Sequence, residues 1–218
     1  MKRFFILFFS LVILTTTMCN KDNSVNNNTL YQTVQILLKL KGPAYQGTYY
    51  PDYLQITTDY AIWIEDAERT FVKTLQITPV AVTVDSAHGS HIEHLPVWSE
   101  ASGLSYEDLE LETDDGIAPS FDGITSASPF FAVGEVEQTL TVNWDLTDAN
   151  GQDIESGIYY CCAEAANIIK DGDFDVGTET NFEINSETIS VQLNLTNGTS
   201  NADPATDNLT GIEATFVE

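Results

Sequence analysis

The sequence predicts an all-β domain, an antiparallel β-sandwich of about seven to eight strands. Short segments of alternating apolar and polar residues recur along the chain, and turn-forming residues separate them. No segment shows the regular succession of strand and long helix that marks a parallel sheet. The chain has 218 residues, of which 43% are hydrophobic, so it is long enough and apolar enough for one domain with a core.

Residues 1–18 are predicted to be a secretion signal rather than part of the fold, because a short basic start precedes an apolar run over residues 4–14. Cys19 follows where bacterial lipoproteins carry their lipid-acceptor cysteine, although Met18 replaces the small residue usual before it. We expect either lipidation at Cys19 or ordinary cleavage, then a polar tether over residues 19–30. In both cases residues 31–218 form a domain outside the cytoplasm, in the periplasm or at the cell surface, with membrane contact only through a lipid.

The first strands are predicted at Thr33–Leu40, Tyr60–Glu65 and Thr70–Ile77. Lys41, Gly42 and Pro43 end the first strand, and the other two form a hairpin across residues 66–69. Strict alternation in the second arm of this hairpin would place four side chains on one face. These are Phe71, Lys73, Leu75 and Ile77.

The middle of the chain has weaker patterns. Residues 79–86 read as extended or loop, whereas Leu95–Gly103 and Tyr106–Leu111 have the spacing of short helices. The second half returns to strands, with a turn-rich connection at residues 145–153 and a polar surface loop at residues 194–208. The strands expected there are Thr139–Trp144, Gly157–Ala165, Phe182–Ile184, Thr188–Leu195 and Gly211–Val217.

The charge is strongly negative, because 33 Asp and Glu face 8 Lys and Arg, giving a formal net charge of −25. Such a surface repels phosphate backbones and anionic head groups, so nucleic acids and bare lipid surfaces are excluded as partners. No Lys or Arg lies between Thr74 and Ile169, so the acids there are expected to be solvated or to bind cations. Solubility outside the cytoplasm explains this balance before any specific activity does.

The adjacent Cys161 and Cys162 are expected to be small core residues. Neighbours on a strand point to opposite faces, which makes an ordinary disulfide between them awkward. The sequence therefore contains no disulfide framework, and the fold must depend on its core.

Several segments carry a family resemblance. Trp144–Gly151 and Gly157–Tyr160 resemble the paired strands of the Ig-like module of flagellar hook-capping proteins. A second set resembles an uncharacterised family of predicted periplasmic Ig-like proteins. This set comprises Ala61–Asp66, Phe71–Leu75, Leu95–Trp98, Ser102–Gly103 and Glu164–Ala166.

The resemblance extends from Thr33 to Val217 and implies an Ig-like form of the sandwich. Members of that family accompany PepSY-type membrane proteins and FMN transferases, so it implies these two as partners and extracytoplasmic, flavin-linked electron transfer as the context. The acidic insert Tyr106–Asp115 and the Asn-rich loop at residues 194–208 depart from the family pattern.

Residues 122–128 resemble the acceptor pattern of FMN transferases, in which the last hydroxyl is esterified to the phosphate of FMN. The matching residues are Asp122, Thr125, Ser126, Ala127 and Ser128, and the resemblance implies covalent FMN on Ser128. Reversible FMN binding is not expected, because a phosphate normally needs nearby cations or a helix N-terminus. The alternative is an ordinary Gly/Ser surface turn.

All three histidines, His88, His91 and His94, fall within seven residues. Spacing of three would place them on one helix face, where they could bind Zn²⁺ or Cu²⁺. The alternative is a set of exposed loop histidines. Two acidic turns, at residues 145–153 and 171–177, are expected to be solvated rather than to bind calcium.

No nucleophile elbow, Walker motif or dinucleotide-binding glycine pattern occurs in the sequence. An independent enzyme is therefore not expected. The sequence favours a non-enzymatic component of an extracytoplasmic flavin-linked redox system. The alternatives are a cofactor-free Ig-like envelope module for binding or structure, and a periplasmic metal-binding protein.

Overall fold

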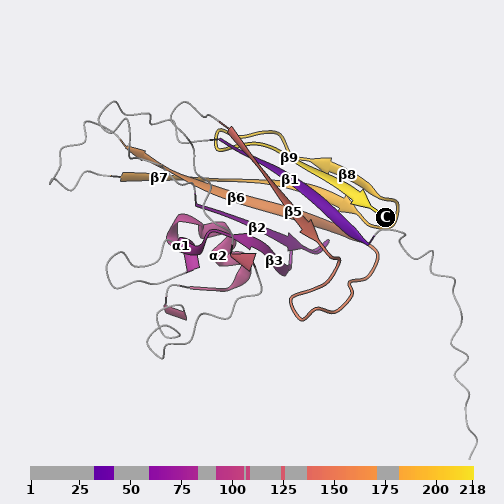
Figure 1. The fold of residues 1–218 in the computed structure, drawn as a ribbon. Helices are drawn as coiled ribbons and strands as arrows, with labels where there is room; N and C mark the ends of the chain where they lie inside the picture. Colours follow the sequence, from indigo (N-terminus) through magenta and orange to yellow (C-terminus); the bar gives the residue numbers. More distant parts are fainter. Residues whose placement is uncertain are drawn as a thin grey trace, which may run out of the picture.

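The computed structural model describes residues 32–41, 59–82, 92–105, 107–108, 124–125, 137–170 and 182–218. These residues form two sheets packed face to face, with a helical layer on the outer side of the larger sheet (Figure 1). The predicted all-β sandwich is confirmed. The described residues contain no helix long and apolar enough to cross a membrane.

The small sheet has three antiparallel strands in the order β5-β1-β9. They are β5 (Glu137–Trp144), β1 (Thr33–Lys41) and β9 (Leu209–Val217). The central strand β1 alternates buried and half-buried residues along its whole length. This is the pattern of a strand that covers a core with one face only, and the strand predicted here is confirmed.

The large sheet has the order β4-β3-β2-β6-β7-β8. Its five longer strands pair antiparallel, and the two-residue β4 (Ile124–Thr125) pairs parallel with β3. These five are β2 (Asp59–Glu65), β3 (Phe71–Ile77), β6 (Ile158–Lys170), β7 (Phe182–Asn194) and β8 (Thr199–Ala202).

Two strand predictions in the second half needed correction. Phe182–Ile184 and Thr188–Leu195 are one continuous strand, β7, which pairs with β6 over 13 residues. The predicted loop at residues 194–208 contains β8, an exposed edge strand paired with the end of β7. Its Asn, Thr and Ser residues indicated a loop because an edge strand exposed on every residue carries no apolar alternation.

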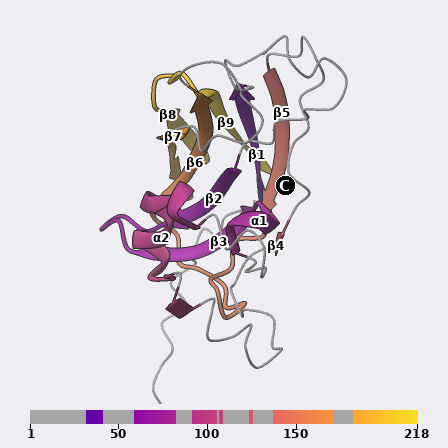
Figure 2. The same ribbon diagram turned by 90° about the vertical axis from the view of Figure 1, so that its left-hand side faces the viewer.

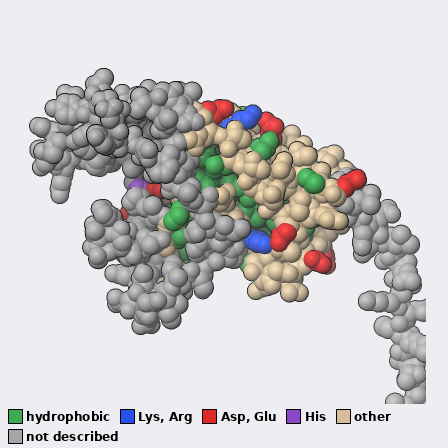
Figure 3. All heavy atoms as spheres, viewed as in Figure 1, with side chains coloured by type: hydrophobic (Ala, Val, Ile, Leu, Met, Phe, Trp, Pro, Cys, Tyr) green, Lys and Arg blue, Asp and Glu red, His purple; other side chains and the backbone are tan. Residues whose placement is uncertain are grey.

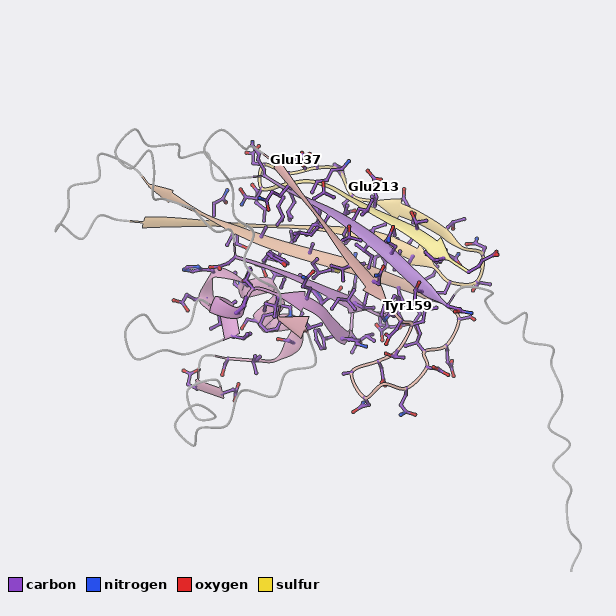
Figure 4. All side chains as sticks on the ribbon, viewed as in Figure 1. Glu137, Tyr159 and Glu213 are labelled. Carbon is purple, nitrogen blue, oxygen red and sulfur yellow. The ribbon has the colours of Figure 1, made fainter. Side chains whose placement is uncertain are left out.

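The main core lies between the two sheets. It contains the inner faces of β1, β2, β6 and β7, together with Trp144 at the end of β5. The Trp144 ring meets Tyr159, which is labelled in Figure 4, edge to face, with centroids 5.4 Å apart. The indole N–H donates to the carbonyl of Thr147, 2.9 Å away, so this buried ring also anchors the turn-rich connection at residues 145–153.

A second apolar cluster lies on the opposite face of the large sheet, beneath the helical layer (Figure 2). This layer, defined here as the described residues from 79 to 105, contains α1 (Pro79–Val82), η1 (Ile92–His94) and α2 (Pro96–Ser102). The helix expected within Leu95–Gly103 is confirmed. The extended or loop conformation expected after residue 79 is wrong for its first four residues, which form α1.

The predicted face of β3 is wrong because two irregularities interrupt its pairing with β2. Strict alternation grouped Leu75 with Phe71 and Ile77. In the structure Leu75 packs into the core between the sheets, whereas Phe71 and Ile77 pack beneath the helical layer. Each irregularity inserts an extra residue and reverses the faces that follow.

Three of the described bases, Lys39, Arg69 and Lys73, form ion pairs with acids. Lys39, on the outer face of β1, bonds Glu213 at 3.0 Å; this ion pair and the nearby Glu137 raise the pKa of Lys39 (Figure 4). Figure 3 shows Lys and Arg side chains next to acidic ones on the viewed face. The described bases in such pairs thus do not form a separate basic patch.

The two faces of β1 provide a direct test of the fold. Leu38→Ala should lower the free energy of unfolding by about 2–5 kcal/mol, because Leu38 is fully buried between the sheets. Leu37→Ala, on the outer face of the same strand, should cost less than about 1 kcal/mol. Urea denaturation of both variants measures the difference, and equal losses would contradict the assigned faces.

Candidate functional site

The face of the large sheet beneath the helical layer is the candidate site, because buried polar groups gather there within an otherwise apolar cluster. The cluster contains Trp63, Cys162 and Ala166 from the sheet and Leu95 and Trp98 from the layer. Three buried acids lie on the same strands: Asp59, Glu65 and Glu164. Each has a specific partner, as buried carboxylates require.

Glu164, in the middle of β6, is fully buried. Its Oε1 accepts from the backbone N–H of Val97 at 3.2 Å and from the Ser186 hydroxyl at 2.5 Å, and its Oε2 accepts from the N–H of Trp98 at 2.7 Å. Burial raises the pKa of Glu164, and these three hydrogen bonds offset only part of that effect. The carboxyl therefore joins β6, β7 and the start of α2.

Asp59, the first residue of β2, forms the second contact with the helical layer. Its Oδ2 lies 2.6 Å from Nδ1 of His94 in η1, and both side chains are buried. The hydroxyl of Thr78, just after β3, contacts both Asp59 and Tyr60. It lies 3.5 Å from Oδ1 of Asp59 and accepts from the backbone N–H of Tyr60. A carboxylate facing Nδ1 favours the tautomer in which Nδ1–H donates to Asp59.

Glu65, at the other end of β2, accepts from the indole N–H of Trp63 at 2.8 Å and from Arg69 at 3.1 Å. The Arg69 guanidinium also lies 3.6 Å from the ring centroid of Tyr160, a cation–π contact. Its remaining contact in this cluster is with Sγ of Cys162 at 3.5 Å. This arrangement holds the β2–β3 hairpin against β6.

The two cysteines lie on opposite faces of β6 as expected. Cys161 belongs to the core between the sheets and Cys162 to the cluster beneath the helical layer, and both thiols are free. Burial raises the pKa of each thiol, and the nearby Glu65 adds to the effect at Cys162. Neither sulfur is activated as a nucleophile.

Of the predicted FMN-acceptor residues, Thr125 lies in β4, opposite Ile77 at the edge of the large sheet. Asp122, Ser126, Ala127 and Ser128 lie outside the described residues, as does the predicted lipid-acceptor Cys19. The structure therefore places the middle of the acceptor segment, Ile124 and Thr125, at a sheet edge.

Of the predicted metal ligands, the structure describes His94 alone, because His88 and His91 lie outside the described residues. The alternative of an exposed loop histidine is wrong for His94, which is 8% exposed and bonded to Asp59. Among the residues that the structure describes, no three His, Cys, Asp or Glu side chains are grouped to hold a metal.

The acidic turn at residues 145–153 has a structural role in this fold. Asp148 accepts from the N–H groups of Asn150 and Gln152 and closes the turn, which lowers its pKa. Burial alone would raise the pKa of Asp145, but hydrogen bonds from Thr147 and Lys73 lower it. The backbone and Lys73 thus engage these carboxylates.

Sequence reasoning missed the roles of Glu164 and Asp59. A signal for Glu164 was present, because it is an acid between the apolar residues Ala163 and Ala165 in a strand expected to be buried. Asp59 gave no comparable signal, since it lies at the start of a strand where an acid is commonly exposed.

A comparison with protein-family profiles matches residues 54–203 to a family described as predicted periplasmic protein (DUF2271). This span includes the large sheet, the helical layer and residues 122–128. The chain belongs to this family. The family's predicted location agrees with the extracytoplasmic placement that the sequence of residues 1–18 predicts. No curated protein and no solved structure matches the chain.

The buried thiols can be tested directly. Cys161 and Cys162 should resist iodoacetamide in the native protein near pH 8, because burial keeps both as thiols, and both should react in strong denaturant. Mass spectrometry after timed quenching measures the two rates. Rapid alkylation of Cys162 in the native state would contradict its burial beneath the helical layer.

Proposed function

We propose that this periplasmic-family protein is a non-enzymatic component of an extracytoplasmic flavin-linked redox system and carries covalent FMN on Ser128. The observation that carries the proposal is the position of β4. The acceptor pattern in residues 122–128 runs through Ile124 and Thr125, which form the edge strand beside β3. A modifying enzyme must reach its acceptor hydroxyl, and a segment at a sheet edge is accessible in a way that a central strand is not.

The short length of chain between Thr125 and Ser128 also supports attachment of FMN at Ser128. Ser128 is three residues beyond Thr125 in the sequence, and a fully extended chain of three residues spans at most about 11 Å. The pairing of Thr125 with Ile77 would therefore hold a flavin close to one end of the large sheet. This end also carries Asp59 and Thr78, where the helical layer begins.

The positions of the bases favour covalent attachment over reversible binding. The bases of the β2–β3 hairpin are Arg69, paired with Glu65, and Lys73, paired with Asp145. Both pairs lie toward the end of the hairpin away from β4, because β3 runs from Phe71 to Ile77 and only its last two residues pair with β4. The described part of the hairpin therefore provides no phosphate cradle at the acceptor edge, and a covalent ester does not require one.

The attachment would form a phosphoester between Oγ of Ser128 and the phosphorus of FMN. A transferase would take FMN from a flavin dinucleotide, breaking its phosphoanhydride bond and releasing the nucleoside monophosphate. The hydroxyl proton would pass to a base of the transferase. Once attached, FMN supplies one- and two-electron transfer, and the protein supplies position and access. The FMN transferase and a PepSY-type membrane protein are the proposed partners.

Co-expression with an FMN transferase tests the proposal. The full-length protein should gain the mass of one FMN ester and the fluorescence of flavin after denaturation. Ser128→Ala should abolish both signals, because it removes the esterified oxygen. Ser126→Ala is the matched control and should retain both, since that position of the pattern requires only a small residue.

A wild-type protein that gains neither mass nor fluorescence would overturn the proposal and favour a cofactor-free envelope module. Labelling that survives Ser128→Ala but disappears in Ser126→Ala or Thr125→Val would move the attachment to another hydroxyl. Intact mass of the protein from its native envelope would also report lipid at Cys19 in the same measurement.

A further inference from the structure

We propose that Glu164 forms a pH-dependent contact, called here the clasp, between the helical layer and the large sheet. The contact stabilises the packed layer when the carboxyl is protonated and is weaker when the carboxyl is ionised. The inference does not depend on flavin attachment. It rests on the position of one buried carboxyl at the contact between two sheet strands and the start of α2.

The start of α2 lacks its usual local cap. Leu95 at the N-cap position makes no side-chain hydrogen bond, and Pro96 has no N–H to donate. The first two backbone donors of the helix are therefore those of Val97 and Trp98, and Glu164 accepts from both. Glu164, which is 66 positions from Trp98 in the sequence, thus replaces the local cap. The same hydrogen bonds therefore cap α2 and attach the helical layer to the sheet.

Among the described residues, none provides a counter-charge beside an ionised Glu164 carboxylate. Its neighbours across the sheet are Ala61 on β2 and Thr188 on β7. Within the described part of the chain, no Lys or Arg pairs with Glu164, and the one base on the elements packed against it is His94, bonded to Asp59. The titratable side chains described on these elements are Asp59, Tyr60 and Glu65 on β2, Glu93 and His94 on η1, Glu100 on α2, and Glu187 on β7.

The protonated carboxyl fits the same geometry. With the proton on Oε1, Glu164 donates to the Ser186 hydroxyl at 2.5 Å, and Oε2 still accepts from the N–H of Trp98 at 2.7 Å. Ser186 can reverse its role because a hydroxyl both donates and accepts. Protonation therefore keeps two of the three contacts and removes a buried charge.

The direction of the pH effect follows from burial. Because burial raises the pKa of Glu164 above its ordinary value of 4.5, the folded protein binds this proton more tightly than the unfolded chain does. The stability that it contributes is fully present below that ordinary value and is lost as the pH rises through the raised pKa. The helical layer should therefore loosen as the pH rises.

Loosening would expose the apolar face that the layer covers. Trp63, Cys162 and Ala166 on the sheet and Trp98 on α2 are all at most 5% exposed. A protein outside the cytoplasm meets wide changes of pH, so a clasp of this kind would make access to this face depend on its surroundings.

Hydrogen exchange of the Val97 and Trp98 amides tests the clasp in the full-length domain. After correction for intrinsic exchange, their protection should fall by up to ~10-fold per pH unit between pH 4.5 and the raised pKa of Glu164 and level off above it, because opening releases the proton that the closed form holds. Amides in the centre of β1 should show no such local trend. Protection at Val97 and Trp98 that does not change with pH would overturn the proposal.

Variants separate a clasp from a merely structural contact. Glu164→Gln should remove the pH trend at Val97 and Trp98. Glu187→Gln is the matched control, because Glu187 also accepts a backbone N–H, that of Asn208, but the hydrogen bonds that it accepts lower its pKa. The control should retain the trend, and its loss there would assign the effect to another group.

The Ser186→Ala variant provides a second test, which remains available if the Glu164→Gln variant does not fold. The Ser186 hydroxyl bond lowers the pKa of Glu164, so its removal should shift the midpoint of the trend to higher pH. A purely structural role would lower protection equally at every pH and leave the midpoint unchanged, and that result would also overturn the proposal.

Discussion

The fold depends on strand β2, which is buried on both faces. Every residue from Asp59 to Glu65 is buried, so the strand needs the small sheet on one side and the helical layer on the other. Its two acids then require partners inside the protein, because an unpaired buried carboxylate is costly. His94 and Thr78 serve one end, and Trp63 and Arg69 serve the other. The polar contacts of the candidate site are thus a consequence of the burial of β2 on both of its faces.

The sequence predicted the small sheet well because β1 has one buried face, and a period of two reports that arrangement directly. It predicted the existence of β2 but not its double burial, since a continuous apolar run does not say what covers each side. The faces of β3 could not be predicted, because register irregularities depend on pairing with a partner strand. Edge strand β8 was missed, since full exposure removes the apolar pattern that marks other strands.

The candidate site was less predictable than the fold for a similar reason. Motif reasoning concerns residues close together along the chain, such as the acceptor segment ending at Ser128 or the three clustered histidines. The contacts that join the helical layer to the sheet connect distant residues, Asp59 with His94 and Glu164 with Trp98. An acid within an apolar strand indicates that a partner exists, but only the fold identifies the partner as a helix N-terminus.

The two ends of the sandwich carry different features. The chain enters β1 at Gln32 beside Val217, and Val34 pairs with Trp144, so the point of entry and the C-terminus share one end (Figure 1). Asp59 and Thr125 lie toward the opposite end, because β2 and β3 each run its length. The start of β1 is thus separated from the β4 edge by the length of the sandwich. A partner that binds at the β4 edge or at the start of the helical layer would therefore contact the end of the sandwich opposite to the start of β1 and the C-terminus.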